Sequence, residues 1–189
     1  MTASGQERRK MSWAIRELDP VSERASFDAV IRLRLRCWGV QMPVQLTADD
    51  VVDPHDGTAR HWVAVANDQV IGAARLTIHD VVDEVPDAVC LGGVLAHHAP
   101  TPIGFLSRLV VAPECRRGGI GRALDQVRVQ AAEEAGCWSL LVLVFDASGE
   151  ARVAQLVSQG FEVRGRGRKD THPKFSVLAA PLVLERIGC

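Results

Sequence analysis

The pattern of apolar and polar positions along the chain predicts alternating strands and helices. An alternating run over 12–19 predicts a first strand, and apolar positions then recur at helical spacing as far as Trp38. Ser22 is a suitable N-cap for this helix. Its expected buried side chains are Phe27, Val30, Ile31, Leu33 and Leu35.

A β-hairpin is expected in the next part of the chain. Two β-prone runs within 61–79 flank Asn67-Asp68, a pair suited to a tight turn. The segment before it, 39–60, is polar and rich in acids and turn residues, which indicates a long connection. Residues 80–102 contain prolines and little periodicity, and we expect a loop or short helix that contacts substrate.

The second half of the chain repeats the alternation. Ile120, Leu124, Val127 and Ala131 follow a helical spacing, and Gly136 stands where a C-terminal glycine is expected. The predicted elements are a strand at 104–112, a helix from about Gly119 to Ala135, an apolar strand at 138–146, a short helix at about 149–159 that ends at Gly160-Phe161, and strands at about 161–166 and 174–184. This order predicts a single α/β domain, with helices flanking a mixed central sheet of about seven strands.

Composition and charge restrict the class of protein. The chain has 189 residues, of which 47% are apolar and 24% charged, as in an ordinary globular domain with a sizeable core. Its net charge of −1 gives no global attraction to nucleic acid or to an anionic membrane, so neither is an expected partner.

The cysteines and the N-terminal segment point to a cytoplasmic protein. Five scattered cysteines without a CxxC pair favour free thiols over disulfides or a zinc site. Residues 1–10 are polar and lack the apolar core of a signal peptide, so we expect a mobile tail before a domain at 11–189. No apolar run approaches the roughly 20 residues that span a bilayer.

The stretch "VAPECRRGGIGR", residues 111–122, holds the most informative chemistry. It joins a predicted strand to a predicted helix and contains three glycines and three arginines. A helix N-terminus attracts anions, glycines allow close approach, and arginine binds phosphate through two parallel hydrogen bonds. A phosphorylated ligand is therefore expected here, the alternative being a strand–helix turn with solvated arginines.

Two common nucleotide motifs do not match this stretch. A P-loop requires Lys-Ser or Lys-Thr after its glycines, and neither pair is present there. A dinucleotide fingerprint requires GxGxxG early in a βαβ unit with an acid about 20 residues on, and "GGIGRA" fits only part of that spacing late in the chain.

A third pattern does match. The strand end Leu109-Val110-Val111-Ala112-Pro113, followed by Arg116-x-x-Gly119-x-Gly121 and a helix, resembles motif A of the GNAT superfamily of acyl-CoA-dependent N-acyltransferases. The predicted element order, the apolar strand 138–146 and the "GF" after the next helix are similar to that family over nearly the whole chain.

The resemblance implies a coenzyme A site at this stretch. Backbone amides from Arg117 to Arg122 would hold the pyrophosphate, the strand end would pair with the pantetheine arm, and an N–H of Leu109 or Val110 would bind the acyl carbonyl. The implied coenzyme-binding residues are Leu109, Val110, Val111, Arg116, Arg117, Gly118, Gly119, Ile120, Gly121 and Arg122.

Shorter pieces of the sequence are similar to the ElaA-like branch of this superfamily. They are "LRLRCW" at 33–38, Asp53-x-x-Asp56 with His61, "GAARL" at 72–76, "SRLVV" at 107–111, and His172 with Phe175 three residues later. The Glu-Gln of that branch after the first helix has no clear counterpart, and Gln41 lies where its acid is expected.

Candidate groups for proton transfer are few. Many members of the superfamily protonate the leaving thiolate with a tyrosine; this chain contains no tyrosine, and the equivalent position is Leu156. His61 and His172 are candidate bases, since histidine titrates in the required range; the alternative for each is a half-buried histidine bonded to backbone. Ser107 could donate to the thioester, or it could be a strand hydroxyl bonded to its neighbour.

Two arginines are expected inside apolar strands, where an unpaired charge is costly. Arg75 and Arg108 either pair with acids such as Asp53 or Asp56, or line a polar cavity and hold an acidic group of the acceptor.

Three other features have simpler interpretations. "RGRGRK" at 164–169 is typical of a solvated hairpin loop, and His97-His98 lacks further ligands at metal spacing, so no metal is expected. Cys115 lies in the anion loop, where positive charge could lower its pKa, but direct attack by an amine needs no cysteine.

The sequence therefore predicts an N-acetyltransferase that moves an acetyl group from acetyl-CoA, its co-substrate, to an amine by direct attack. The acceptor is a small molecule or a peptide, and the oligomeric state is open, although dimers are common in such families. The alternatives are a non-catalytic acyl-CoA-binding regulatory or sensor module with the same fold, and a different nucleotide-binding enzyme.

Overall fold

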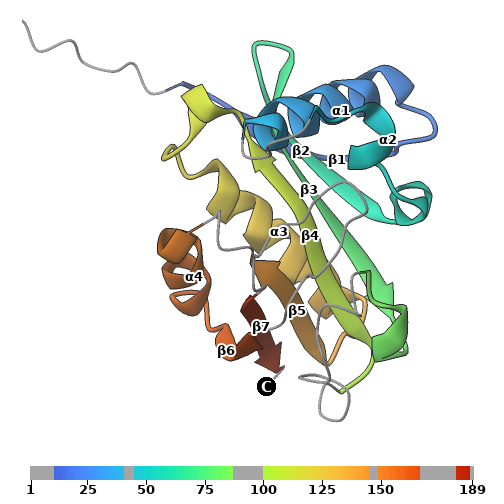
Figure 1. Ribbon diagram of the computed structural model, residues 1–189, viewed down its shortest axis with the longest axis vertical. Helices are drawn as coiled ribbons and strands as arrows, with labels where there is room; N and C mark the ends of the chain where they lie inside the picture. Colours follow the sequence, from blue (N-terminus) through green and yellow to red (C-terminus); the bar gives the residue numbers. More distant parts are fainter. Residues whose placement is uncertain (1–10, 41–44, 87–99, 145–148, 167–181, 188–189) are drawn as a thin grey trace, which may run out of the picture.

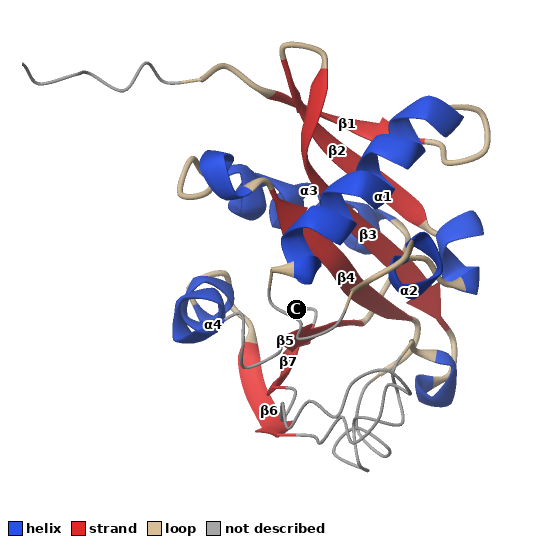
Figure 2. Ribbon diagram, turned by 45° about the horizontal axis from the view of Figure 1, so that its top comes forward, coloured by secondary structure: helices blue, strands red, loops and turns tan. Residues whose placement is uncertain are grey.

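A mixed β-sheet with helices on both faces makes up the described part of the protein. The computed structural model describes residues 11–40, 45–86, 100–144, 149–166 and 182–187. Strands β1 to β5 form the main body of the sheet, which β7 and β6 extend in the order β1-β2-β3-β4-β5-β7-β6 (Figures 1 and 2). The strands are β1 (Ala14–Leu18), β2 (Arg60–Ala66), β3 (Gln69–His79), β4 (Ile103–Val111), β5 (Ser139–Val144), β6 (Glu162–Arg166) and β7 (Leu182–Ile187).

In the described residues, α-helices occur in the connections from β1 to β2, from β4 to β5 and from β5 to β6. Among the described residues, β4 and β5 form the parallel pair, and the other neighbouring strands run antiparallel. The helices are α1 (Arg24–Gly39), α2 (Ala48–Val51), α3 (Ile120–Glu134) and α4 (Gly149–Val157), with 3₁₀ turns η1 (Pro54–Gly57), η2 (Val82–Glu84) and η4 (Pro113–Cys115). The expected α/β fold, with helices flanking a mixed sheet, is confirmed.

Several predicted boundaries were wrong. Helix α1 has Glu23 rather than Ser22 as its N-cap, because the Ser22 hydroxyl donates to Asp19 at 2.6 Å instead. The polar segment 39–60 is not a plain connection, since it contains α2 and η1. The described part of the last strand runs through Ile187 rather than ending at 184, and β6 includes the first residues of the expected 164–169 loop.

The hairpin of β2 and β3 forms as predicted. Asn67 and Asp68 both have positive φ, 47° and 60°. Two positive φ values are characteristic of the tight turn whose twist matches that of the flanking strands, and Asn and Asp tolerate them better than most residues.

Helices α1 and α3 cover opposite faces of the sheet. A Cβ on Gly72 of β3 would lie 2.9 Å from Ile120 Cγ2 of α3, whereas the Arg75 side chain contacts residues near α1 and η1. Because successive side chains of a strand alternate between faces, these contacts assign α3 to one face and α1 to the other. The core consists of the apolar side chains between these layers.

Candidate functional site

Strands β4 and β5 separate part-way along their length. They pair only from Ile103 with Ser139 to Phe105 with Leu141, yet β4 continues to Val111 and β5 to Val144. Figure 2 shows β5, β7 and β6 turning away from β4. The C-terminal part of β4 therefore faces an opening in the described sheet on its β5 side, an edge where an extended ligand can pair with it.

A β-bulge lies in β4 at this opening. Ser107 pairs with Arg75 and Val110 with Ala73, so Arg108 and Leu109 together stand opposite the single residue Ala74. Arg108 has φ of 56°, unusual for a bulky side chain and a mark of a constrained backbone. The bulge directs both the Ser107 and Arg108 side chains to the α1 face, because both contact groups there.

The glycine-rich stretch joins the same end of β4 to helix α3. Gly119 is the N-cap of α3, with φ of 85°. Glycine has no side chain that could cap the first N–H groups of the helix, and no cap from another described residue is seen. Arg117 also has positive φ, 65°, and the residues from Arg116 to Gly119 are exposed. Of the other expected coenzyme-binding residues, Ile120 and Val110 are buried, Arg122 is exposed, and Leu109, Val111 and Gly121 are intermediate.

A cluster of charged side chains lies on the α1 face beside the bulge. Asp53 takes one arginine on each oxygen, with Arg75 Nη1 at 2.6 Å from Oδ1 and Arg108 Nη2 at 2.6 Å from Oδ2. Asp56 pairs with both Nη atoms of Arg34 at 2.9 Å and with Arg75 Nη1 at 3.2 Å. We call these five residues the arginine–aspartate cluster. It confirms that Arg75 and Arg108 pair with acids.

Exposure distinguishes the members of this cluster. The Arg34, Arg75 and Asp56 side chains are at most 3% exposed, whereas the Arg108 side chain is 23% exposed. The Arg108 guanidinium also lies over the ring of Trp38, 5.2 Å from its centroid. Arg108 is thus the arginine of the cluster that a ligand on this face can reach.

The arginines keep both carboxylates ionised. Burial alone would raise the pKa of Asp53, but hydrogen bonds and charge from Arg75 and then Arg108 outweigh burial and hold it well below its usual range. Burial would likewise raise the pKa of Asp56, but hydrogen bonds and charge, mainly from Arg34, outweigh burial and lower it. Both side chains therefore carry full negative charge at neutral pH.

His61 is buried beneath α1 rather than open to a ligand. It is 2% exposed, its Nε2 lies 2.9 Å from the Asp56 carbonyl oxygen, and Phe27 packs against its ring edge-on. Burial is the main cause that lowers its pKa, which favours the neutral ring. This geometry favours the alternative of a histidine bonded to backbone.

The other candidate groups for proton transfer are less informative. Ser107 Oγ accepts a hydrogen bond from Arg75 Nε at 3.0 Å, as expected of a strand hydroxyl bonded to its neighbour. His172 lies outside the described residues, as do Gln41 and His97-His98. Leu156, at the position where many relatives carry tyrosine, is fully buried in the core.

A buried polar network joins α3 to the bulge and to α4. Arg128 is fully buried; its Nη1 donates to the carbonyl oxygens of Arg75 and Ser107, both at 3.1 Å. Its Nη2 pairs with Asp125, which also binds Arg152 of α4. Arg128 and Asp125 were not predicted from the sequence. The signal that could have identified them is their spacing of three residues beside the apolar stripe of α3.

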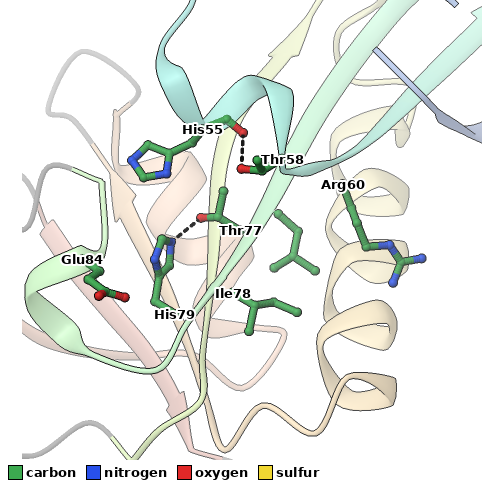
Figure 3. Close-up of a pocket in the computed structure, with 8 residues that line it drawn as sticks. His55, Thr58, Arg60, Thr77, Ile78, His79 and Glu84 are labelled. Atoms are coloured by element: carbon green, nitrogen blue, oxygen red, sulfur yellow. Dashed lines mark hydrogen bonds between the residues drawn. The ribbon is translucent and has the colours of Figure 1, made fainter. Parts of the chain in front are cut away.

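A separate pocket of 620 Å³ lies near the far end of β3. Figure 3 shows His55 and Thr58 on one side and Thr77 and His79 facing them, with His79 Nε2 at 2.8 Å from Thr77 Oγ1. Glu84 also lines the pocket. No group of three or more potential metal ligands occurs among the residues with described positions.

Cys115 is not an activated thiol, in line with the interpretation that the chemistry does not need it. Burial and the neighbouring Glu114 raise the pKa of its thiol, and the charge of Arg36 does not offset them. A raised pKa makes this thiol a poor nucleophile at neutral pH.

Comparison with known proteins agrees with this geometry. Residues 27–161 match the model of the acetyltransferase (GNAT) family. The chain belongs to this family. No curated protein matches the sequence. The ElaA-like branch, in contrast, remains a prediction.

Solved structures resemble this GNAT protein over almost its full length. An N-acetyltransferase from Staphylococcus aureus Mu50 has a TM-score of 0.64 at 17% identity, covering 93% of this chain and 98% of that one. A ribosomal-protein-alanine N-acetyltransferase from Brucella melitensis has a TM-score of 0.65 at 21% identity, covering 92% and 99%. A chain of the NatC complex bound to Gag peptide and CoA has a TM-score of 0.66 at 13% identity, covering 95% and 100%. At these identities the likeness shows the fold alone.

None of the helices in the described ranges is long and apolar enough to cross a bilayer.

Proposed function

We propose that this GNAT protein is an N-acetyltransferase that transfers the acetyl group of acetyl-CoA to an amine by direct attack. The observation that carries the proposal is the opening between β4 and β5, which has a backbone bulge beside it and an uncapped helix N-terminus at the same end of β4. Acyl-CoA needs these features together. A strand edge pairs with its pantetheine arm, a backbone N–H binds its acyl carbonyl, and a helix N-terminus holds its phosphates.

The glycines of the loop support the phosphate cradle. A Cβ on Gly119 would meet nothing within 4 Å, and one on Gly121 would lie at an ordinary 3.9 Å from Leu109 and Val111. Packing within the protein therefore does not require glycine at either position. Gly119 is needed for its positive φ, and the absence of a side chain at Gly121 leaves room for a ligand. The backbone amides from Arg117 to Arg122 would hold the pyrophosphate.

In the reaction, the amine nitrogen attacks the acetyl carbonyl carbon, and the C–S bond breaks as the C–N bond is completed. Backbone N–H groups of the bulge, at Leu109 or Val110, would stabilise the oxygen as it gains charge. The amine proton passes to a base. His172 stays a candidate from the sequence, whereas the burial of His61 and its contact with the Asp56 carbonyl disfavour it in this role. Because an ordinary thiol has a pKa of about 8.5, the thiolate can leave without an assigned protein acid and take its proton from water.

Arg108 is our candidate for recognition of the acceptor. Arg75 has carboxylates at 2.6 and 3.2 Å and is almost fully buried, so it serves the cluster rather than a ligand. Arg108 has Asp53 as its carboxylate partner in the described structure and remains partly exposed. We propose that it attracts an acceptor with an acidic group. An amino acid should then be acetylated with higher kcat/KM than its amide, and Arg108→Gln should remove that preference.

The first experiment is calorimetric titration with acetyl-CoA, in parallel with 3′-dephospho-CoA and ATP. Acetyl-CoA binding much tighter than ATP binding is expected, because ATP lacks the pantetheine arm that pairs with β4. Absence of acetyl-CoA binding would overturn the cradle. CoA release with a panel of amines then separates the enzyme from the alternative, a non-catalytic acyl-CoA-binding module, which the lack of tyrosine favours.

A further inference from the structure

Arg128 is a buried cation whose contacts go beyond a simple ion pair. Its side chain is fully buried, and burial is the main cause that lowers its pKa, to about 10, so it remains charged at neutral pH. A buried ion pair is often no more stabilising than apolar side chains of the same volume. The ion pair with Asp125 alone therefore does not explain an arginine at this position.

The additional contacts are hydrogen bonds to two carbonyl groups at the bulge. Nη1 lies 3.1 Å from both the Arg75 oxygen and the Ser107 oxygen, and these two residues face each other across β3 and β4. Nε donates to the Leu124 oxygen at 3.1 Å, which fixes the guanidinium on its own helix. A planar guanidinium held at three of its nitrogens has little freedom to move.

The Ser107 carbonyl is part of the peptide group that leads into the bulge. In a trans peptide the C=O and the next N–H point in opposite directions. Ser107 O accepts a hydrogen bond from Arg128, so the N–H of Arg108 points away from that guanidinium. On the side of β4 that faces β5, the residues beyond Phe105 have no registered β5 partner among the described residues. The Arg108 φ of 56° then sets the direction of the next N–H groups, at Leu109 and Val110.

We infer that Arg128 is a positioning residue for the acetyl carbonyl: it fixes the Ser107–Arg108 peptide from the α3 face and thereby orients the N–H groups of the bulge. Asp125 pairs with Nη2 of Arg128 and also contacts Arg152 and Gln155 of α4, whereas the bulge is held through Nη1, which none of these residues contacts. This inference rests on the proposed function, because it assigns Arg128 to the carbonyl site of that reaction.

The variants separate positioning from stability. Arg128→Lys keeps the charge but, with one ammonium in place of a fork, cannot hold both carbonyls and Asp125. The double variant Arg128→Met with Asp125→Asn removes the positive charge of Arg128 and the negative charge of Asp125 together. This second variant therefore leaves no buried carboxylate facing an apolar side chain. Arg152→Met is the matched control, since it removes an arginine from Asp125 without touching the bulge.

The experiment is isotope-edited infrared spectroscopy of acetyl-CoA labelled with ¹³C at its carbonyl, bound to each protein. The wild-type protein and Arg152→Met should shift the carbonyl band to lower frequency than in water, and both Arg128 variants should lose at least half of that shift. With an acceptor from the amine panel, kcat should fall about 10- to 100-fold in the Arg128 variants. KM for acetyl-CoA should stay within about threefold of wild type, because the phosphate cradle is intact.

The outcomes are distinguishable. If wild-type protein binds no acetyl-CoA, the proposed function fails and the inference fails with it. If wild-type protein binds and turns over acetyl-CoA, and a folded Arg128 variant keeps the band shift and kcat, the inference alone is overturned. An equal loss in Arg152→Met would also overturn it, since general weakening of the network would then be the cause.

Discussion

Gly119 combines a backbone requirement with a position beside the proposed phosphates. Its φ of 85° disfavours other residues, and a Cβ there would meet no neighbour within 4 Å. Asn tolerates this region better than most residues, so Gly119→Asn should retain coenzyme binding. Gly119→Glu should abolish it, because a carboxylate at the cradle repels the pyrophosphate. Titration of both variants with acetyl-CoA is the measurement, and equal affinity of Gly119→Glu and wild type would contradict the cradle.

Asp56 gives the residue-scale prediction about pH. Its folded-state pKa is lowered, so its contribution to stability is fully present above the unfolded-state pKa of about 3.9 and is lost as the pH falls through the folded-state pKa. Asp56→Asn should therefore lower the free energy of unfolding at pH 7 by about 3 kcal/mol, and by progressively less below about pH 4. Urea unfolding at several pH values tests this.

A surface pair provides the control for Asp56. Glu17 pairs with Arg60 at 2.7 Å, but both side chains are more than 40% exposed. Glu17→Gln should change the free energy of unfolding by about 1 kcal/mol or less. A cost for Asp56→Asn no larger than this would mean that the buried arginines do not depend on its charge.

Sequence reasoning at the residue scale identified which residues matter better than it identified their partners. The pairing of Arg75 and Arg108 with Asp53 and Asp56 was one of the two alternatives drawn from the sequence, and the coenzyme-binding role of the loop residues stays a prediction. Arg34 was not foreseen, because an arginine within an apolar stripe is ordinarily assigned to the solvent side. The positive φ of Arg108 was also not foreseeable: it depends on how β4 pairs with β3, which no local pattern encodes.

At the scale of elements, two glycines allow α3 to approach the sheet closely. A Cβ on Gly72 would lie 2.9 Å from Ile120, the first residue of α3, whereas one on Gly104 would lie 2.8 Å from Leu140 and 3.0 Å from Ala132, near the other end of the helix. Both Gly72→Ala and Gly104→Ala should cost about 1–3 kcal/mol of stability through overpacking.

Only one of these substitutions should affect the coenzyme. Gly72→Ala displaces the end of α3 that carries the glycine-rich loop, so it should weaken acetyl-CoA binding, and Gly104→Ala should not. Calorimetric titration of the two folded variants compares them directly. Equal weakening by both would indicate that α3 responds as a whole and not at its N-terminus.

Periodicity predicted the helices and strands well and their connections poorly. The apolar spacing of α1 and α3 and the continuous apolar run of β5 were sufficient to identify these elements. Helices α2 and η1 are too short for any periodicity, and both begin with a reciprocal capping arrangement in which the N-cap side chain and an acid three residues on satisfy backbone N–H groups. That signal lies in Thr47 with Asp50 and in Asp53 with Asp56, within a segment interpreted as a connection.

At the scale of the whole molecule, the coenzyme is proposed to bind beside the shortest strand pairing of the described sheet. Only three residue pairs join β4 to β5 in the described structure. A ligand that fills the opening would contact both parts of the sheet. Acetyl-CoA at about 100 times its Kd should then stabilise the protein by about 2.7 kcal/mol, which raises Tm by about 5–11 °C.

Hydrogen exchange locates that stabilisation. Amides in the C-terminal part of β4 and in β5 should gain protection with acetyl-CoA, and ATP at the same concentration should protect neither. Protection limited to the loop at 116–121 would mean that the nucleotide binds without insertion of the pantetheine arm between the strands.

The arginine–aspartate cluster also limits how this sequence can drift over evolutionary time. Each of its carboxylates contacts two arginines, and most of its members are shut off from water. Loss of one member leaves the charge of another unpaired in the protein interior, where it is poorly solvated. Neutral drift at these five positions must therefore proceed through compensated pairs of changes, whereas the solvent-exposed arginines of the helical surfaces can be exchanged one at a time.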